Sequence, residues 1–397
     1  MKNKFNKLEN KNFTIIAKTF FGLENVLAEE LKSIGAQNIE PINRAVSYTG
    51  NNEVLYKSNL CLRTALKVLK PIFNFTVKNE DDLYKKIKEY EWDTILSAKK
   101  TLAVDVQVNS DLFRNSRFVT YRIKDAVVDY FKDKYNRRPF INIDNPHIQI
   151  NVFIYQDKCT VSIDSSGDSL HRRNYRIRDG IAPLNEVLAA GLVLLTGWDK
   201  KSTLYDPMCG SGTIPIEAAM IACNIAPNIK RTQYSFQGWN DYDSSLWNKI
   251  VDEARNNIVE HDGYIYASDI SELAYSQTLE NVNNAFHGDD YNIKLSIKPI
   301  DKVAQPKDAG IVIINPPYGE RMRTELINNL YSNIGTTLKH NFAGFDAWII
   351  SSNFEALRNV GLHTSRKITL YNGKLECKFQ NYKLYEGSKK LKKQEEI

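Results

Sequence analysis

The chain has 397 residues, of which 42% are hydrophobic and 25% are charged, with a formal net charge of +6. This balance excludes a disordered chain and predicts a folded protein of two or three domains. No apolar run approaches the roughly 20 residues that cross a bilayer, so we expect neither membrane insertion nor secretion. The five cysteines and six histidines are dispersed, which favours a cytoplasmic protein with reduced thiols and no metal site.

Hydrophobic periodicity over the first 165 residues predicts two small α+β modules. The first combines strand and helix patterns at 13–20, 22–31, 46–48 and 54–69. The second combines three strand patterns with one long helical pattern, at 102–108, 119–135, 148–155 and 159–163. Only Gln156-Asp157-Lys158 separates the last two strands, which is the spacing of a hairpin.

After Gly180 the pattern changes, because short and nearly all-apolar strands begin to alternate with helices. The strand patterns lie at 203–205, 264–267, 293–298, 311–314 and 347–351, and the helical patterns at 183–195, 214–223, 273–283, 325–339 and 354–360. This alternation predicts a parallel sheet covered by helices on both faces. The last two runs, 368–371 and 375–385, flank Asn372-Gly373, a strong hairpin turn, so we expect the sheet to end in an antiparallel strand.

The first candidate motif is the run from Asp206 to Thr213, DPMCGSGT, at the carboxyl end of the first sheet strand. Ligands bind at that edge in open α/β sheets. Gly210 and Gly212 let the backbone approach a ligand, and Asp206 can accept from an ammonium or a hydroxyl. A P-loop is excluded because no Gly-Lys-Ser/Thr follows, and Pro215 replaces the third glycine of a dinucleotide motif. A plain tight turn is the alternative interpretation.

A second acid, Asp269, ends the next strand and is placed to bind a ribose diol. The alternative is a helix N-cap before Ile270. The spacing of 269 − 206 = 63 residues indicates an insertion at about 224–247, which is rich in aromatics and which we expect to pack over the site. Asp301 follows a further strand and could accept from an adenine amino group.

The third motif, Asn315-Pro316-Pro317-Tyr318, follows a buried strand. Two consecutive prolines bar a helix and extend the backbone, so the Asn315 amide and the Pro316 carbonyl point outward. Two acceptors aimed at one exocyclic NH2 bind both of its protons and leave the nitrogen lone pair free to attack a methyl sulfonium. Tyr318 offers a face for an extruded base. The alternatives are a simple loop and a polyproline ligand.

Basic residues form two clusters that suit RNA phosphates and unstacked bases. The candidates for RNA contact are Arg114, Arg117, Lys124 and Arg138 in the first cluster and Arg172, Arg173 and Arg176 in the second. A solvated surface is the alternative for both clusters, and the second could also hold an interface between domains. The lysine-rich end, 389–397, is interpreted as a solubilising tail.

Two of these motifs, the run from Asp206 to Thr213 and Asn315-Pro316-Pro317-Tyr318, resemble those of class I amino-methyltransferases. The closer resemblance is to bacterial 23S rRNA guanine-N2 methyltransferases that carry an N-terminal THUMP domain. It extends to Ser162–Tyr175 (SIDSSGDSLHRRNY) and to Ala182–Ala190 (APLNEVLAA), and it covers the chain from about Phe13 to Tyr385. The chain departs from the family pattern at Asn174, where glycine is usual, and this puts only a turn conformation in doubt.

The resemblance implies a ferredoxin-like subdomain at 1–72, a THUMP RNA-binding domain at 73–166 and a Rossmann-like, seven-stranded methyltransferase domain at 167–388. It implies S-adenosylmethionine as cofactor. The expected cofactor contacts are Asp206, Met208, Cys209, Gly210, Gly212, Asp269, Ile270 and Asp301.

The expected reaction is methylation of a guanine N2 in 23S rRNA. Methylation of adenine N6 in RNA or DNA is the near alternative, because the Asn-Pro-Pro-Tyr motif binds any planar amine. A non-catalytic RNA-binding assembly factor is the alternative from another class. The sequence does not set the oligomeric state.

Overall fold

The computed structural model describes residues 12–113, 115–176, 184–288, 291–304, 309–317 and 324–385. The chain divides into two compact units. The first unit comprises Met1–Thr19, Ala28–Leu170 and Arg231–Asp252, and the second comprises Phe20–Leu27, His171–Lys230 and Glu253–Ile397. Among the described helices, none combines the length and the apolar composition that a membrane span requires.

The first unit is built on one continuous eight-stranded sheet. Its strand order is β2 (Gln37–Ile42), β3 (Ala45–Gly50), β1 (Phe13–Lys18), β4 (Lys67–Thr76), β8 (Lys158–Asp164), β7 (Ile148–Tyr155), β5 (Thr101–Asn109) and β6 (Phe140–Ile141). The long strand β4 pairs with β1 near its start and with β8 over the rest of its length. The two modules predicted from sequence therefore share a strand.

One predicted helix is wrong in its extent. The pattern at 54–69 predicted a single helix, but α2 runs only from Asn52 to Cys61. The side chain of Asn51 caps its start, and Leu62 is already extended, with φ −72° and ψ 120°. Because Val68 and Leu69 face the core from β4, the apolar periodicity continued past the end of the helix.

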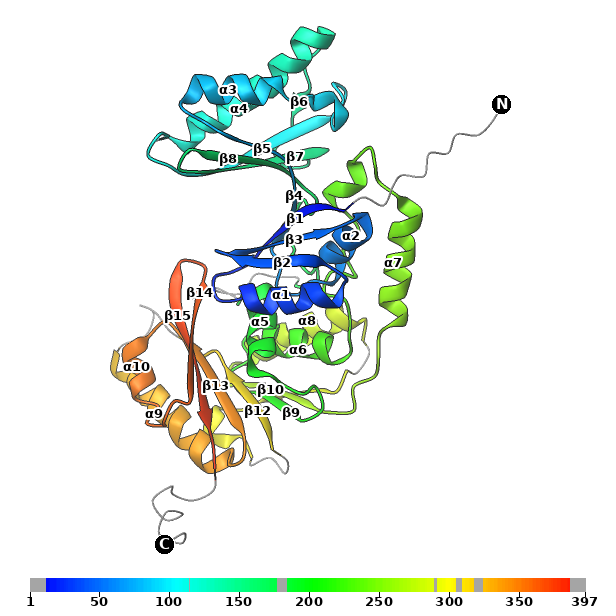
Figure 1. The fold of residues 1–397 in the computed structure, drawn as a ribbon. Coiled ribbons are helices and arrows are strands. Elements are labelled where there is room, and N and C mark those ends of the chain that lie inside the picture. The colour runs from blue at the N-terminus through cyan, green and yellow to red at the C-terminus, as the bar shows by residue number, and fades with distance from the viewer. Residues whose placement is uncertain are drawn as a thin grey trace. The chain divides into compact units, whose positions relative to one another are not determined.

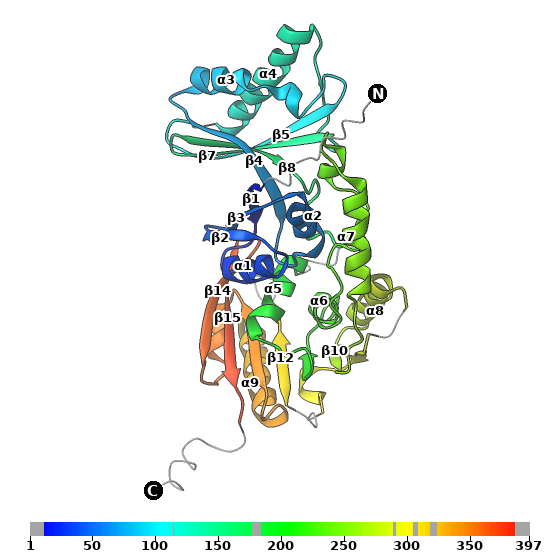
Figure 2. The same cartoon turned by 45° about the vertical axis from the view of Figure 1, so that its right-hand side comes forward.

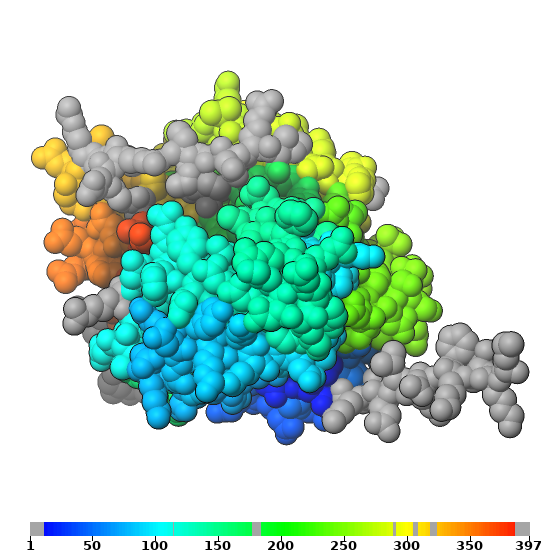
Figure 3. Space-filling model, turned by 90° about the horizontal axis from the view of Figure 1, so that it is seen from above, coloured from blue at the N-terminus to red at the C-terminus, as the bar shows by residue number. Residues whose placement is uncertain are grey.

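The helices α3 (Glu80–Glu89) and α4 (Ser116–Tyr135) lie side by side and cover one face of β5, β7 and β8 (Figures 1 and 3). Their buried side chains include Ile87 and Phe131, and the sheet contributes alternate residues such as Val152 and Val161. The face of these strands that points away from α3 and α4 carries polar and aromatic side chains.

The aromatic insertion belongs to the first unit from Arg231 on, and the expectation that it packs over the site stays a prediction. It contains the short helix η2 (Ser235–Gly238) and α7 (Ser244–Asn256). The ring of Phe236 stacks on Tyr56 of α2 with centroids 4.5 Å apart, and Trp247 meets Tyr56 edge-on at 6.1 Å. All three rings are buried. The partner of the insertion is therefore α2.

The second unit contains a seven-stranded sheet, as predicted. Its order is β11 (Ile293–Ile297), β10 (Ile265–Asp269), β9 (Thr203–Asp206), β12 (Gly310–Ile314), β13 (Asp346–Ser351), β15 (Leu375–Lys383) and β14 (Arg366–Asn372). Neighbouring strands from β11 to β13 are parallel, and β15 is antiparallel to both β13 and β14. The strand order reverses between β9 and β12, which is the position where open α/β sheets bind ligands.

Along the chain, helices alternate with the strands of this sheet (Figure 2). They are α5 (Glu186–Thr196), α6 (Thr213–Ala222), α8 (Glu272–Phe286), α9 (Thr324–Asn341) and α10 (Phe354–Arg358). Another helix, α1 (Glu24–Ser33), begins in the second unit and ends in the first. Strands β12 and β13 consist almost entirely of buried apolar residues, as expected for parallel strands covered on both faces.

We predict that Phe236→Ala lowers the stability of the first unit by about 3–5 kcal/mol, because it leaves a cavity among Tyr56, Tyr234 and Trp247. The effect is measured as a shift in the thermal unfolding midpoint and as faster amide exchange in residues 235–247. Tyr264→Ala, at an exposed ring of the second unit, is the matched control and should change stability by no more than about 0.5 kcal/mol. Equal losses in the two variants would contradict this account of the insertion.

Candidate active site

The site is built where β9 and β12 end side by side. These strands are parallel, with Tyr205 opposite Val312, so the residues that follow them leave the same edge of the sheet. Asp206 ends β9, and Asn315 follows β12 directly. Asp269 ends β10, which pairs with the other side of β9. The fold therefore brings the first residues of all three predicted motifs to one edge.

The glycine-rich loop after β9 is held by hydrogen bonds to the neighbouring strand and helix. The backbone N–H of Gly210 donates to Asp269 Oδ2 at 3.0 Å. From α8, the Thr278 hydroxyl donates to the Gly210 carbonyl at 2.7 Å, and Asn281 donates to the Ser211 carbonyl at 2.9 Å. Thr278 and Asn281 were not predicted as site residues, because their only signal in the sequence is a pair of polar residues at helical spacing in an amphipathic helix.

The two glycines of this loop have different roles. Gly212 begins α6 with φ +80°, and a Cβ there would lie 2.6 Å from Thr278 Cγ2. Gly210 has φ +55°, but a Cβ there would meet nothing within 4 Å. Gly212 thus allows the loop to pack on α8, whereas Gly210 leaves open space beside the loop that a ligand can enter.

Asp206 is buried, and one of its oxygens is not satisfied. Its Oδ1 accepts from the Met208 N–H at 3.3 Å, whereas no hydrogen-bond donor reaches Oδ2 among the described residues. Burial above all, together with the nearby charge of Asp269, raises the pKa of Asp206 to about 8. A buried acceptor of this kind suits a ligand that brings a donor.

Asp269 has both oxygens engaged by backbone donors. Its Oδ1 accepts from the Ser271 N–H at 2.9 Å, and Ser271 is the residue that caps α8. The alternative interpretation of Asp269 as the helix N-cap is wrong, because the N-cap of α8 is Ser271. A carboxylate has about four acceptor sites, so Asp269 retains capacity for a diol.

Asn315 presents a second unsatisfied acceptor. Its Oδ1 is buried, and none of the described residues donates to it. Pro316 is buried and Pro317 is exposed. Tyr318 lies outside the described residues. The edge thus holds two buried acceptor oxygens, Asp206 Oδ2 and Asn315 Oδ1, that the described protein leaves without donors.

The remaining predicted cofactor residues lie at the same edge or beside it. Ile270 follows Asp269 and is 71% exposed, which leaves its side chain available for an apolar contact. Asp301 is exposed in the short helix η3 (Ile300–Lys302) after β11. Met208 and Cys209 are half-buried, and burial raises the pKa of the Cys209 thiol, so it is not poised as a nucleophile.

Two of the predicted RNA-binding arginines are structural, which is a correction. Arg173 is 1% exposed and lies 3.5 Å from Glu217, so it does not reach RNA. Arg176 pairs with Glu186 at 3.0 Å and donates to Ser211 at 3.4 Å and to Thr213 at 3.0 Å. It therefore fixes the loop that carries Gly210 and Gly212. A run of arginines in sequence cannot reveal acidic partners that lie far along the chain.

The other basic candidates keep their status as predictions. Arg172 is exposed. On α4, the Arg117 side chain donates to the Tyr121 hydroxyl at 3.4 Å, and the Lys124 ammonium lies 5.0 Å from the Tyr121 ring. Arg138 follows α4 and is exposed beside Asp129. Arg114 and the lysine-rich tail lie outside the described residues.

Asn174 adopts the left-handed conformation, with φ +64°. Glycine is the usual residue at this position in the family that the sequence resembles. Asparagine is one of the few other residues that tolerate this region, so the substitution preserves the turn.

Three regions of the chain match known protein families. Residues 14–69 match an RlmL ferredoxin-like domain, residues 77–164 a THUMP domain, and residues 173–381 an RMKL-like methyltransferase domain. A protein of Synechocystis sp. that is named as an RNA methyltransferase is 36% identical, over 92% of this chain and 95% of its own length. The chain belongs to the RMKL-like methyltransferase family.

Two further relatives extend the likeness. The ribosomal RNA large subunit methyltransferase K/L of Syntrophotalea carbinolica is 35% identical over 92% of this chain, and the match covers 53% of that protein. This chain thus spans about half the length of that relative. A methyltransferase solved in complex with SAH superposes with a TM-score of 0.84 and 27% identity, over 95% of this chain and all of the other.

Membership in this family confirms the predicted class I methyltransferase fold and S-adenosylmethionine as the methyl donor. The three matched regions follow the predicted order of the modules, whereas the individual site residues stay predictions. The residues at the edge fit such a cofactor, because Asp206 offers a buried acceptor and Gly210 open space. The described residues contain no group of three His, Cys, Asp or Glu side chains that could hold a metal ion.

We predict that Arg176→Met weakens binding of S-adenosylhomocysteine on the order of tenfold, because the loop loses its charge-assisted hydrogen bonds at Ser211 and Thr213. Isothermal titration calorimetry measures the dissociation constant directly. The control is Arg172→Met, which removes an exposed guanidinium four residues earlier and should leave the constant unchanged. If both variants bind as tightly as the parent, Arg176 does not position the loop.

Proposed function

We propose that this protein transfers a methyl group from S-adenosylmethionine to the exocyclic N2 amine of a guanine in 23S rRNA. The observation that carries the proposal is the buried Oδ1 of Asn315, to which no described residue donates, at the edge where Asp206 also offers an acceptor. An oxygen in that state needs an N–H or O–H from a ligand. An amine supplies two N–H groups, one for Asn315 and one for the Pro316 carbonyl.

The chain's own residues prepare the amine rather than deprotonate it. Asn315 and Pro316 hold both protons, which draws the nitrogen lone pair out of conjugation and directs it at the donor. S-adenosylmethionine supplies a methyl group on a positively charged sulfur. The N–C bond forms as the C–S bond breaks. The electron pair of the C–S bond stays on sulfur, which gives S-adenosylhomocysteine. The methylated nitrogen then loses one proton to solvent, so no strong base is required.

The same geometry argues for an amino group over a ring nitrogen. Guanine N7 carries no proton and is itself an acceptor. Placed beside Asn315 Oδ1, it would leave two acceptors facing one another with no hydrogen between them. The exocyclic amines of guanine, adenine and cytosine all satisfy Asn315, and the choice of guanine rests on the resemblance of the sequence motifs to those of guanine-N2 methyltransferases.

The THUMP match and those relatives also support ribosomal RNA as the substrate. A base must leave its stack to reach a pocket at the edge of a sheet. Tyr318 remains our candidate for stacking on the extruded base. A cytoplasmic location remains a prediction.

We propose that Asp206 accepts a hydrogen bond from the cofactor as an ionised carboxylate. Its pKa of about 8 in the free protein lies above the ordinary aspartate value, so the folded form holds this proton more tightly than the unfolded form does. The sign follows directly: the free protein loses stability as pH rises from about 4 to about 8. Binding of the cofactor then requires loss of the proton.

Cofactor affinity should therefore rise about tenfold per pH unit up to about pH 8 and level off above it. Calorimetry of S-adenosylhomocysteine at several pH values, in buffers of different ionisation enthalpy, measures both the affinity and the proton release. Asp206→Asn should bind more weakly at high pH and lose the pH dependence. A flat profile for the parent protein would show that Asp206 is already ionised or does not meet the cofactor.

Asn315→Ala is predicted to reduce methyl transfer by at least roughly 100-fold, because the amine loses a preorganised acceptor. Its affinities for S-adenosylhomocysteine and for RNA should stay within about twofold of the parent values. Single-turnover transfer of labelled methyl to unmodified 23S rRNA measures the rate. Activity equal to that of the parent would reject the catalytic role and favour a non-catalytic RNA-binding factor.

The base is identified by digesting the labelled RNA to nucleosides. We expect the label in N2-methylguanosine. Label in N6-methyladenosine would keep the role of Asn315 and replace guanine by adenine, whereas label in 7-methylguanosine would overturn the amine mechanism.

A further inference from the structure

At the ends of β5 and β7 and the start of β8, one face of the first unit's sheet carries exposed side chains. Helices α3 and α4 pack on the other face of β5, β7 and β8 (Figure 1). Strand register aligns the outward side chains in two rows across these three strands. We call the residues of these rows the open face: Gln107, Asn109, Phe153, Tyr155, Lys158 and Thr160.

Two aromatic rings stand on the open face. Phe153 is 43% exposed and Tyr155 is 52% exposed, whereas Val152 and Ile154, which alternate with them along β7, are fully buried. The two rings are nearly parallel, with an interplanar angle of 20° and centroids 6.5 Å apart. Two aromatic side chains on the same face of a strand usually pack against apolar neighbours on the adjacent strands. Here those neighbours are polar.

The cross-strand neighbours are suited to hydrogen bonding with base edges and phosphates. Phe153 lies opposite Gln107 on one side and Thr160 on the other. Tyr155 lies opposite Asn109 and Lys158. Amide side chains both donate and accept, and the lysine supplies a positive charge. Exposed rings set among such groups form a stacking surface for unpaired bases.

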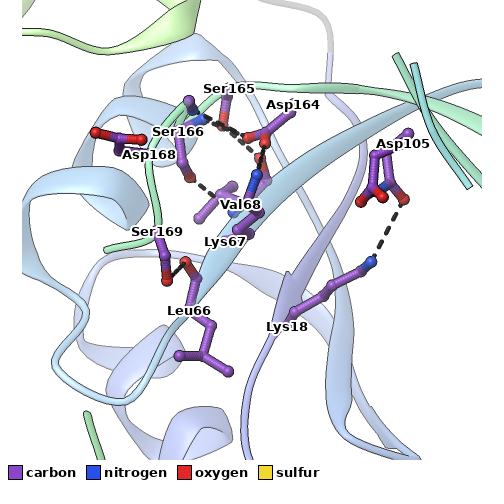
Figure 4. A network of polar contacts seen from close by, with 12 residues as sticks. Lys18, Leu66, Lys67, Val68, Asp105, Asp164, Ser165, Ser166, Asp168 and Ser169 are labelled. Carbon is purple, nitrogen blue, oxygen red and sulfur yellow. Dashed lines mark hydrogen bonds and ion pairs between the residues drawn. The ribbon is translucent and has the colours of Figure 1, made fainter. Parts of the chain in front are cut away.

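A polar network that includes Lys18, Lys67, Asp105 and Asp164 is shown in Figure 4. The Lys18 ammonium lies 3.4 Å from both Gln107 Oε1 and Asn151 Oδ1, and it points toward Asp105. Lys67, opposite Lys18 on β4, pairs with the buried Asp164 at 2.5 Å. Burial foremost lowers the pKa of Lys18. The side chains of Lys18 and Lys67 are thus held in place by these contacts.

The network leads into a cavity of about 510 Å³. Its lining includes Lys67, His147, Gln149, Ser166 and Arg231. Gln149 precedes Asn151, Phe153 and Tyr155 at alternate positions of β7, so all four side chains belong to the same face of the sheet. A cavity of this size accommodates a nucleotide.

The wall of the cavity is fixed by Arg231. Its guanidinium donates to the backbone carbonyls of Ser166 at 2.9 Å, Asp168 at 2.8 Å and Ser169 at 3.2 Å. The loop after β8 is thereby joined to the start of the aromatic insertion. The cavity is a built feature of the first unit rather than a gap between mobile loops.

We propose that the open face and this cavity together bind a single-stranded segment of the RNA substrate. Phe153 and Tyr155 stack on two bases, Lys158 neutralises a phosphate, and the cavity takes a further nucleotide. From Tyr155 to Gln149 the strand rises roughly 20 Å, which spans about three or four nucleotides. A duplex is disfavoured because its base faces are stacked on one another and cannot reach the rings. The inference rests on the proposed function only in naming RNA as the substrate.

Binding is tested in the full chain carrying Asn315→Ala, without cofactor, so that catalysis plays no part. The probe is a fluorescein-labelled 12-nucleotide single-stranded RNA of mixed sequence, and the readout is fluorescence anisotropy. Phe153→Ala and Tyr155→Ala should each weaken binding on the order of tenfold. A hairpin RNA of the same length without a loop longer than four nucleotides should bind more weakly than the single strand.

Two kinds of variant separate stacking from folding. Phe153→Tyr and Tyr155→Phe keep a ring and should bind within about twofold of the parent, whereas Tyr264→Ala removes an equally exposed ring of the second unit and should have no effect. A 4-thiouridine probe should form a photo-crosslink to the peptide containing residues 148–155. Parental affinity in both alanine variants, or crosslinks confined to α4, would overturn the inference even if the protein methylates guanine. Loss of binding in a protein that methylates no RNA would keep the inference and reject the proposed function.

Discussion

The central constraint of this structure is a pair of buried hydrogen-bond acceptors without donors at the edge where β9 and β12 end. An unsatisfied buried acceptor destabilises the fold that contains it, and Asp206 Oδ2 and Asn315 Oδ1 are both in that state among the described residues. Strand pairing fixes the backbone beneath each, and the Pro-Pro step stiffens the chain after Asn315. The free protein therefore leaves both oxygens without protein donors at the place where the cofactor and the base amine bind.

Most of the catalytic fold could be predicted from sequence, because its signals are local. The all-apolar run at 311–314 and the Asn372-Gly373 turn indicate β12 and the terminal hairpin without knowledge of their partners. The prediction of elements failed where one apolar pattern continued across two of them, as between α2 and β4. The strand β2 went unnoticed because most of its side chains are exposed and show no alternation. Sharing of β4 by two modules depends on long-range pairing that no local pattern encodes.

The site residues also fall into those that the sequence alone could predict and those that it could not. Both motifs are contiguous, so their chemistry could be inferred from residue types alone. The supporting residues could not, because Thr278 and Asn281 act on a loop that lies about 70 residues earlier. Arg173 illustrates the converse error, since an arginine-rich run suggested an RNA surface while its partner Glu217 lies far along the chain. The aromatic insertion was recognised, but its partner Tyr56 is even more distant in sequence.

The most direct measurement is a crystal structure of the chain with S-adenosylhomocysteine and a short RNA containing the target guanine. The account predicts a cofactor donor at hydrogen-bond distance from Asp206 Oδ2 and the guanine N2 amine at hydrogen-bond distance from Asn315 Oδ1. A complex in which Asn315 Oδ1 accepts from a protein group, while the base binds through another edge or away from the cofactor, would contradict it.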